Sequence, residues 1–271
     1  MSTADEVNSS CPADAALDLA TEMLYRFLAA LLSEPRTAGW QLVLDPASQT
    51  LAVEAAQLLR EEGSAGTPQL GYGELPADEL DLTSVLSALH TKDVDFAAEY
   101  ARVFGLVSCR ECPPYETEFH PNEDTFFRSQ QMADVAGFYR AFGVQPGAAS
   151  RERPDQLTLE LEFAAFLLLK QRLATPLDAE NDAVKSPETQ LCMAARAAFV
   201  RDHLNWWLPS FSLALRRKAE CGLYEGAGRL LAALLPIERA RLGVQAPSLP
   251  ILEPRSAESE GECTGCAAMT S

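Results

Sequence analysis

Two pairs of cysteines have the spacing that metal sites and redox-active thiols use. Cys109 and Cys112 stand in "CREC", and Cys263 and Cys266 stand in "CTGC". Two such pairs can surround a tetrahedral Zn²⁺ with four thiolates. Zinc suits this set better than an iron–sulfur cluster, because neither pair carries further cysteines. We therefore predict one shared structural zinc site, closed by the return of the C-terminal tail to the first pair across about 150 residues.

The same cysteines allow other interpretations. They can form two independent thiol pairs, one of them redox-active, or stand by chance in a loop and a tail. His120 follows the first pair closely and could replace one thiolate as a ligand. Seven cysteines are an odd number in a long chain without a secretion signal, so a disulfide framework is not expected.

The first cysteine pair leads into "CPPYETEF", a stretch that combines aromatic and acidic side chains and suits neither a helix nor a strand. Tyr115 and Phe119 can offer apolar surface, while Glu116 and Glu118 can face a guanidinium group. The two prolines restrict the loop before anything binds. The pattern indicates a binding site for a basic, partly apolar partner. The alternative is a solvated loop whose aromatic rings pack into the protein's own core.

The charge of the chain limits its partners. It carries 22 basic and 39 acidic residues, a formal net charge of −17. Such a charge disfavours nucleic acid and anionic membranes and favours basic partners. The longest apolar run, residues 163–169, is too short to span a bilayer, and the N-terminal residues lack the pattern of a signal peptide. We therefore expect a cytoplasmic protein that neither binds nucleic acid nor inserts stably into a membrane.

Apolar residues recur at helical spacing along almost the whole chain. In the first predicted helix six of them share one face, namely Leu17, Ala20, Leu24, Phe27, Leu28 and Leu31. In the second, at 48–63, the apolar face is predicted to contain Leu51, Ala55, Leu58 and Leu59. Further helices are predicted at 78–90, 94–104, 122–143, 154–174, 187–209, 210–221 and 223–243.

Three features complete the prediction of the fold. Pro209 is expected to break or kink the helix that contains it. Trp206 and Trp207 are adjacent, so one helix face cannot bury both equally, and we expect at least one of them in the core. No segment alternates apolar and polar residues as a strand would. The sequence predicts an all-α fold of nine or ten helices, with residues 16–242 as one domain between a flexible N-terminus (1–15) and a polar tail (243–271).

Five segments, in this order, carry a resemblance to a known family: "FAAEYARVFGL", "CPPYETEF", "AGFYRAFG", "ERPDQLTLELEF" and "FVRDHLNWWLPSF". With them the chain, over roughly residues 18–235, resembles the TorD/DmsD/NarJ family of cytoplasmic chaperones for molybdenum-containing redox enzymes. The resemblance implies an all-helical accessory protein rather than a catalyst. It also implies binding of the twin-arginine leader, or of another segment, of a molybdopterin oxidoreductase catalytic subunit until cofactor insertion is complete.

The family's short motif is a Glu, a Pro-Asp pair and a His before a core helix. Glu152, Pro154 and Asp155 match it, and Gln156 occupies the position where His is usual. Glutamine forms hydrogen bonds but does not titrate, which removes the basis for a pH-dependent role at this position. We predict that these four residues bind the client together with the aromatic and acidic residues of 115–119. The alternative is that Pro154 and Asp155 simply start a helix.

Two other classes of function stay open. A redox sensor would use the cysteine pairs, and a delta-type accessory subunit would remain bound to its partner enzyme. The chain has no glycine-rich phosphate loop before a helix and no nucleophile elbow, so we do not expect an enzyme. No cofactor is required for the predicted chaperone function, and the protein is expected to be a monomer or a homodimer.

Overall fold

The computed structural model describes residues 12–105, 111–121, 124–145, 152–175, 186–219, 222–248 and 252–254. Within these residues it has ten α-helices, namely α1 (Pro12–Leu31), α2 (Trp40–Leu44), α3 (Pro46–Gly66), α4 (Thr83–Leu89), α5 (Phe96–Phe104), α6 (Thr125–Ala141), α7 (Leu157–Ala174), α8 (Pro187–Phe199), α9 (Asn205–Lys218) and α10 (Gly222–Leu242). Two 3₁₀ turns, η1 (Ala77–Glu79) and η2 (Glu116–Phe119), and one π turn, η4 (Val200–Leu204), join them. The described residues contain no strand, which confirms the all-α prediction.

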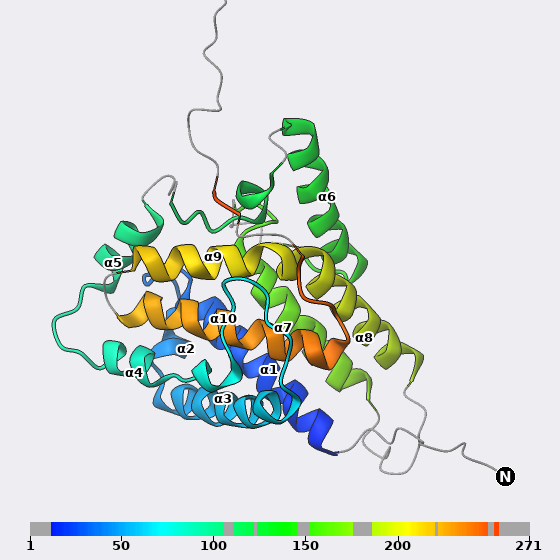
Figure 1. Cartoon of the computed structure of the whole chain (residues 1–271), viewed down its shortest axis with the longest axis horizontal. Helices are drawn as coiled ribbons and strands as arrows, with labels where there is room; N and C mark the ends of the chain where they lie inside the picture. Colours follow the sequence, from blue (N-terminus) through cyan, green and yellow to red (C-terminus); the bar gives the residue numbers. More distant parts are fainter. Residues whose placement is uncertain are drawn as a thin grey trace, which may run out of the picture.

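The helices form a layered bundle in which α9 and α10 run side by side (Figure 1). Helix α1 packs against both α3 and α7, and α7 also packs against α8. Helix α6 projects from one corner of the bundle, and only Val135 and Tyr139 of its side chains are buried (Figure 1). None of the described helices is long and apolar enough to cross a membrane.

The predicted apolar face of α1 is confirmed. All six of its predicted core residues are buried, from Leu17 at the start to Leu31 at the end. Their spacing of three and four residues places them along the side that meets α3 and α7. Helix α2 was not predicted, although it buries Trp40, whose indole N–H donates to the carbonyl of Ser33.

The predicted apolar face of α3 is partly wrong. Ala55 and Leu59 are buried, but Leu51 is 50% exposed and Leu58 is 37% exposed. Small residues line the buried face instead, among them Gly63, where an added Cβ would lie 2.7 Å from carbon atoms of η1 and α10. Small side chains let α3 approach its neighbours closely, so the larger leucines lie beside that contact and face solvent.

Helix α7 begins at Leu157, three residues later than predicted, so Pro154 is not part of it. The preceding backbone is paired elsewhere. Glu116 donates its N–H to the carbonyl of Asp155 (3.0 Å), and Leu157 donates its own to the carbonyl of Pro114 (2.9 Å). These hydrogen bonds hold residues 154–156 against the loop in a turn that the Gln156 N–H closes on the carbonyl of Arg153 (3.1 Å), and the helix can start only after them.

Pro209 does not end its helix, contrary to one of the two predicted outcomes. It lies inside α9, and the run from α8 through η4 to α9 is continuous in sequence. The irregular turn lies upstream, in the π turn Val200–Leu204. Such wide turns occur mostly as single insertions in helices and often near functional residues. Here the turn carries His203 into the interior.

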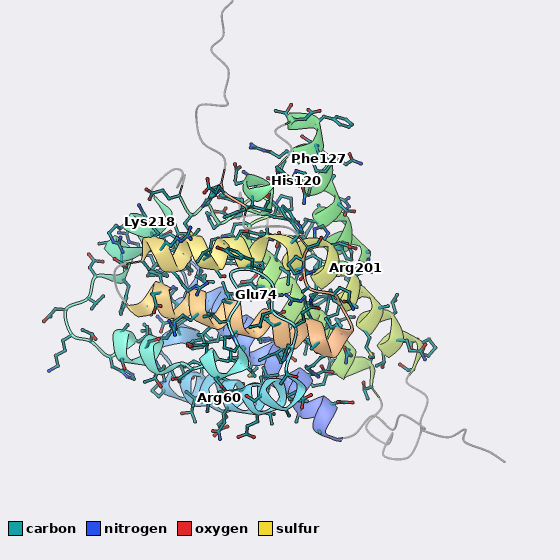
Figure 2. The ribbon with its side chains drawn as sticks, viewed as in Figure 1. Arg60, Glu74, His120, Phe127, Arg201 and Lys218 are labelled. Carbon is teal, nitrogen blue, oxygen red and sulfur yellow. The ribbon has the colours of Figure 1, made fainter. Side chains whose placement is uncertain are left out.

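A buried ion pair fixes the long loop after α3. Arg239 of α10 donates to both oxygens of Glu74, at 2.9 Å in one of the two contacts, and to the carbonyl of Gln69. The side chains of Arg239 and Glu74 are almost fully buried. Figure 2 shows Glu74 in the middle of the bundle, so this loop crosses over the helices rather than extending into solvent.

Candidate functional site

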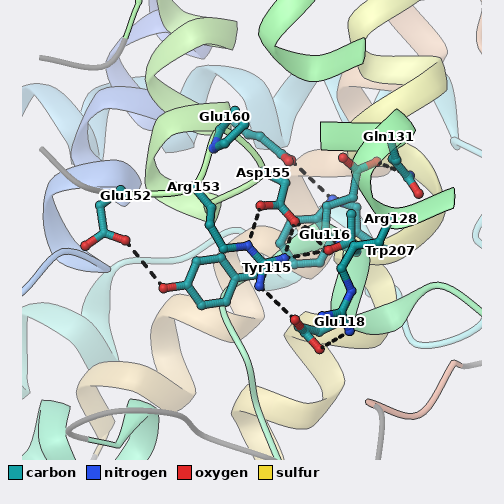
Figure 3. Close-up of polar contacts among 12 residues, drawn as sticks. Tyr115, Glu116, Glu118, Arg128, Gln131, Glu152, Arg153, Asp155, Glu160 and Trp207 are labelled. Carbon is teal, nitrogen blue, oxygen red and sulfur yellow. Dashed lines mark hydrogen bonds and ion pairs between the residues drawn. The ribbon is translucent and has the colours of Figure 1, made fainter. Parts of the chain in front are cut away.

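The eight residues predicted to bind a client come together in one place. Residues 114–117 run antiparallel to 155–157, with an isolated β-bridge between Tyr115 and Gln156. The loop after α5 therefore lies against the segment before α7. Figure 3 shows the side chains of both segments converging on one polar network.

Asp155 is the centre of this network. Its carboxylate is fully buried and accepts hydrogen bonds from the backbone N–H (3.1 Å) and the hydroxyl (2.8 Å) of Thr117. Arg153 approaches the same carboxylate with two nitrogens, at 3.0 and 2.7 Å. A buried charge is tolerated only when it is paired and hydrogen-bonded, and Asp155 is both. Its role in this structure is to hold the two segments together.

The guanidinium of Arg153 connects the buried centre to the surface. It donates to Glu118 at 2.8 Å, and its central carbon lies 4.3 Å from the centre of the Tyr115 ring. Glu118 also accepts from Arg128 of α6 at 3.3 Å, and the Tyr115 hydroxyl donates to Glu152 at 3.4 Å. Glu118 was predicted to face a partner's guanidinium, and the guanidinium groups that it meets here are the chain's own.

Glu116 lies deeper and is fully buried. It accepts hydrogen bonds from Gln131 of α6 (3.0 Å) and from the Trp206 indole (2.8 Å), and His203 Nδ1 lies 3.3 Å from both of its oxygens. Burial raises the pKa of Glu116, while its hydrogen bonds to His203 and Trp206 act in the opposite direction. This side chain links η2 to α6, the π turn and α9.

Glu160 of α7 is a second fully buried carboxyl group beside the first. One of its oxygens accepts from the Trp207 indole at 3.2 Å, and the other meets no N–H donor. Burial, together with the nearby charges of Glu116 and Asp155, raises the pKa of Glu160 well above its ordinary value. Glu116 accepts from two N–H donors and also has His203 Nδ1 within reach, whereas Glu160 has one donor. The charged form of Glu160 is stabilised by fewer donors, which agrees with the larger rise of its pKa.

Gln156 acts as the N-cap of α7. Its side-chain oxygen accepts from the N–H groups of Thr158 (2.8 Å) and Leu159 (3.2 Å). Those groups would otherwise lack partners in the first turn of the helix. Beside it, the carbonyl of Pro154 accepts from the Tyr139 hydroxyl at 2.9 Å. The motif that distinguishes the family thus starts a helix and anchors the segment before it.

Aromatic side chains pack against one another next to the polar network. Phe119 is buried, with its ring centre 5.6 Å from that of Trp207 and 6.3 Å from that of Phe211. Trp207 is in the core, as predicted for at least one of the tryptophans, and Trp206 is half-buried. Figure 2 shows His120 and Phe127 next to each other beside the first part of α6, and their ring centres are 4.3 Å apart.

The predicted residues divide into a surface set and a buried set. Glu152 is exposed, and Tyr115, Glu118 and Pro154 are half-buried. The buried set consists of Glu116, Phe119, Asp155 and Gln156. The buried set fixes the backbone, and only the surface set can touch a partner without a rearrangement of the network.

Several residues of the network were not predicted, among them Arg153, Gln131, Glu160 and His203. For Glu160 the sequence held a signal, because Leu157, Glu160, Leu161 and Ala164 share one helix face that is otherwise apolar. An acid within a buried stripe indicates a partner inside the protein. Arg153 gave no comparable signal, since it stands in a short loop with no periodicity.

The cysteine prediction falls mostly outside the described residues. Cys109, Cys263 and Cys266 are not described, and Cys112 is fully buried. Among the described side chains no group of three or more potential ligands could hold a metal ion.

The part of the tail that is described returns to the vicinity of the first cysteine pair. The N–H of Leu252 donates to the hydroxyl of Ser210 in α9 at 2.9 Å. Leu252 and Pro254 line a cavity of about 550 Å³ together with Glu111, which stands next to Cys112. The described part of the tail therefore lies close to Glu111, the residue before Cys112.

Comparison with known proteins points to one family. A sequence model of the nitrate reductase delta subunit family matches residues 74–212. The chain is 34% identical over 134 residues to the selenate reductase assembly chaperone protein of Thauera selenatis, covering 49% of this chain and 63% of that protein. It is 33% identical over 131 residues to the chlorate reductase assembly chaperone protein of Ideonella dechloratans, covering 48% and 61%.

A third relative matches over a longer stretch. The chaperone protein TorD of Vibrio cholerae is 29% identical over 190 residues, which cover 69% of this chain and 70% of that protein. The chain thus spans less than two thirds of the length of the first two relatives, although the family match extends over half of its own length. The chain belongs to the nitrate reductase delta subunit family, which confirms the resemblance to the TorD/DmsD/NarJ proteins.

Proposed function

We propose that this protein is a system-specific chaperone for a molybdopterin oxidoreductase. It binds the twin-arginine leader, or another segment, of the catalytic subunit and assists cofactor insertion and assembly before export. The observation that carries the proposal is the similarity to assembly chaperones of two different reductases within a family that matches half of the chain. We place its action in the cytoplasm, where a subunit is assembled before export, and we propose no catalytic activity.

The geometry of the site supports binding of a basic, partly apolar segment. The bridge between 115 and 156 and the ion pairs of Arg153 hold the surface residues in place before a partner arrives. Such preorganisation reduces the entropy lost on binding. Tyr115 offers an aromatic face and Glu152 an exposed carboxylate, and the net charge of −17 attracts a cationic peptide.

Calorimetric titration tests the proposal. The titrant is the leader peptide, and then the full apo-subunit, of the molybdoenzyme encoded beside this protein. We expect binding that weakens as salt is added, because the charges lie at the surface. Tyr115→Ala and Glu152→Gln should each weaken binding by about 1–2 kcal/mol. Tyr72→Ala and Glu54→Gln, which remove an exposed tyrosine and an exposed glutamate that take no part in the network, serve as controls. If neither the leader nor the apo-subunit binds, the proposal fails.

Co-purification and the response to oxidant or chelator separate the chaperone from the two other classes of function. A permanent delta-type subunit would co-purify in equal amounts with the mature enzyme, whereas a chaperone is released. A redox sensor would change state with oxidant or chelator and bind no leader. Size-exclusion chromatography with light scattering decides between a monomer and a homodimer.

We further propose that the two cysteine pairs share one structural zinc ion. The position of Leu252–Pro254 beside Glu111 supports the return of the tail on which this site depends. Cys263 follows Pro254 by nine residues, which can span up to roughly 30 Å when extended. Because Pro254 and Glu111 line the same cavity, a span of this length is enough for Cys263 to return to the neighbourhood of Glu111.

A further inference from the structure

A second cavity lies where α6 ends against α7. Its volume is about 230 Å³, and its walls are Tyr139, Val144, Gln145, Leu159, Glu162, Phe163 and Phe166. The turn at its rim is fixed by Gly143, whose φ of 72° suits glycine, and by a 3.0 Å hydrogen bond from the Val144 N–H to the carbonyl of Tyr139. Most of the cavity wall is apolar, Gln145 adds a polar amide, and Glu162 is its one charged residue.

The cavity exists because one stripe of α7 lacks a covering helix. Leu159, Glu162, Phe163 and Phe166 follow the spacing of a single helix face. Other faces of α7 pack against α1 and α8, whereas the described lining of this one outside α7 consists of Tyr139, Val144 and Gln145. The ring of Phe163 is buried and lies 4.8 Å from Tyr139 and 6.1 Å from Phe166, centre to centre. The packed rings of Tyr139, Phe163 and Phe166 therefore form one wall of the cavity.

Glu162 places a carboxylate at the mouth of this apolar cavity. The side chain is accessible to solvent, yet its apolar neighbours bury it enough to raise its pKa. No basic side chain within the described ranges forms an ion pair with it. Two acids of the neighbouring site, Asp155 and Glu118, differ in this respect, because Arg153 or Arg128 neutralises them. As far as the described residues go, the carboxylate at the cavity is thus available to a cation from a partner.

We infer that this cavity receives a large apolar side chain of the client peptide while Glu162 pairs with a basic residue next to it. The inference rests on the proposed function and names the place where the client's apolar part binds. The cavity adjoins the candidate site directly, since Tyr139 lines it and donates to the carbonyl of Pro154. A peptide that contacts Tyr115 and Glu152 can thus extend along the start of α7. A leader with basic residues followed by apolar ones has the required chemistry.

A titration with paired peptides tests this inference. The probe is a synthetic peptide in which two arginines precede a leucine-rich run, compared with the same peptide carrying two glutamines instead. Glu162→Gln should weaken binding of the arginine peptide about tenfold and leave the glutamine peptide unaffected, because only the first loses a charge pair. Phe166→Ala should weaken both peptides, since it removes apolar contact area.

Two variants on α3 serve as matched controls. Glu54→Gln removes an exposed carboxylate and Leu51→Ala an exposed apolar side chain, and neither should change affinity by more than about twofold.

If the wild type binds but Glu162→Gln and Phe166→Ala bind equally well, the cavity is not the site, although the proposed function stands. If the wild type binds neither peptide but binds the apo-subunit, the same variants are titrated with the apo-subunit, and unchanged affinity overturns the inference. If the wild type binds neither the peptides nor the apo-subunit, the proposed function itself fails.

Discussion

Gln156 stands where the motif of the resembled family has a histidine, and it has a structural role at that position. The side chain caps α7 by accepting from two N–H groups of its first turn. Gln156→Ala should therefore lower the free energy of unfolding by about 1 kcal/mol, the usual cost of a lost N-cap. Urea denaturation followed by circular dichroism measures the change. Gln57→Ala on the exposed side of α3 is the control and should change stability by less than about 0.5 kcal/mol. Equal effects of the two substitutions would show that the cap contributes nothing.

Glu160 should make the stability of the protein depend on pH. Its pKa is raised above the ordinary value of 4.5, so the folded protein keeps a proton that the unfolded chain releases. The resulting stabilisation is complete below 4.5 and is lost as the pH rises through the raised pKa. Glu160→Gln, which imitates the protonated form, should reduce this loss and raise stability on the alkaline side by about 1–3 kcal/mol.

Denaturation curves measured between about pH 5 and pH 8 test this prediction. Glu54→Gln is the control, because that side chain is exposed on α3 and its substitution should leave the slope unchanged. A Glu160→Gln protein whose stability falls with pH as steeply as the wild type would place the titrating proton elsewhere.

At the level of residues, the sequence predicted which positions meet but not how they meet. The aromatic and acidic residues of 115–119 and the motif at 152–156 do lie together. The residue types did not show which of these side chains are buried, because a carboxylate such as Asp155 can be buried when an arginine pairs with it. Arg153 is that arginine, and its pairing depends on a contact between segments separated by more than thirty residues in the chain.

At the level of elements, periodicity predicted the helices well and their ends less well. The start of α7 was missed because backbone pairing with residues 114–116 overrides the preference of proline for a first turn. The face of α3 was partly missed because close helix packing selects small residues, which carry little signal in a hydrophobicity pattern. Both errors have the same origin, since each depends on a neighbour that is distant in sequence.

The contact between α8 and α10 contains a buried ion pair whose energy can be measured. Arg196 binds Glu238 through two nitrogens, at 2.7 and 2.6 Å, and both side chains are almost fully buried. Arg196 also reaches Asp18 of α1 at 2.8 Å. Glu238→Leu leaves the buried arginine with only part of its partners and should cost about 3–5 kcal/mol of unfolding free energy. Adding Arg196→Met should recover much of this loss, because no unpaired charge then remains buried.

A double-mutant cycle in urea gives the coupling energy between the two side chains. The control is the pair of Arg201 and Asp202, which are 59% and 41% exposed, so Asp202→Asn should cost less than about 1 kcal/mol. A Glu238→Leu protein as stable as Asp202→Asn would mean that the pair does not hold α8 on α10.

At the level of the whole molecule, the order of the helices was predictable and their partners were not. Helix α1 lies outside the residues that match the family model, yet it packs along α7, which lies within them. Polar contacts reinforce this packing, since Gln171 donates to Asp18 at 2.6 Å and Arg172 pairs with Glu22. Periodicity indicates that a face is apolar but not which distant helix will cover it. The all-α class therefore followed from the sequence, whereas the arrangement of the bundle did not.

The path of the tail leads to a prediction for the molecule as a whole. If the pairs in "CREC" and "CTGC" share one ion, protein purified without chelator should contain about one Zn²⁺ per chain, bound by four thiolates. Removing the ion should expose the tail beyond Pro254 to proteases while the helices, which have their own core, stay folded. Tail cleavage followed by mass spectrometry, together with circular dichroism, measures both effects.

Cysteine variants show whether one site or two is present. Cys109→Ser and Cys263→Ser should reduce the zinc content equally and release the tail equally, because each removes a ligand of the same ion. Cys192→Ser is the matched control, since this buried cysteine of α8 belongs to neither pair and its loss should leave the metal content unchanged. Two independent thiol pairs would instead give a metal-free protein in which each substitution affects only its own segment. Elemental analysis that finds no metal in reduced wild-type protein would leave contacts such as those of Gln245 with Asn205 and of Leu252 with Ser210 as the described attachments of the tail to the bundle.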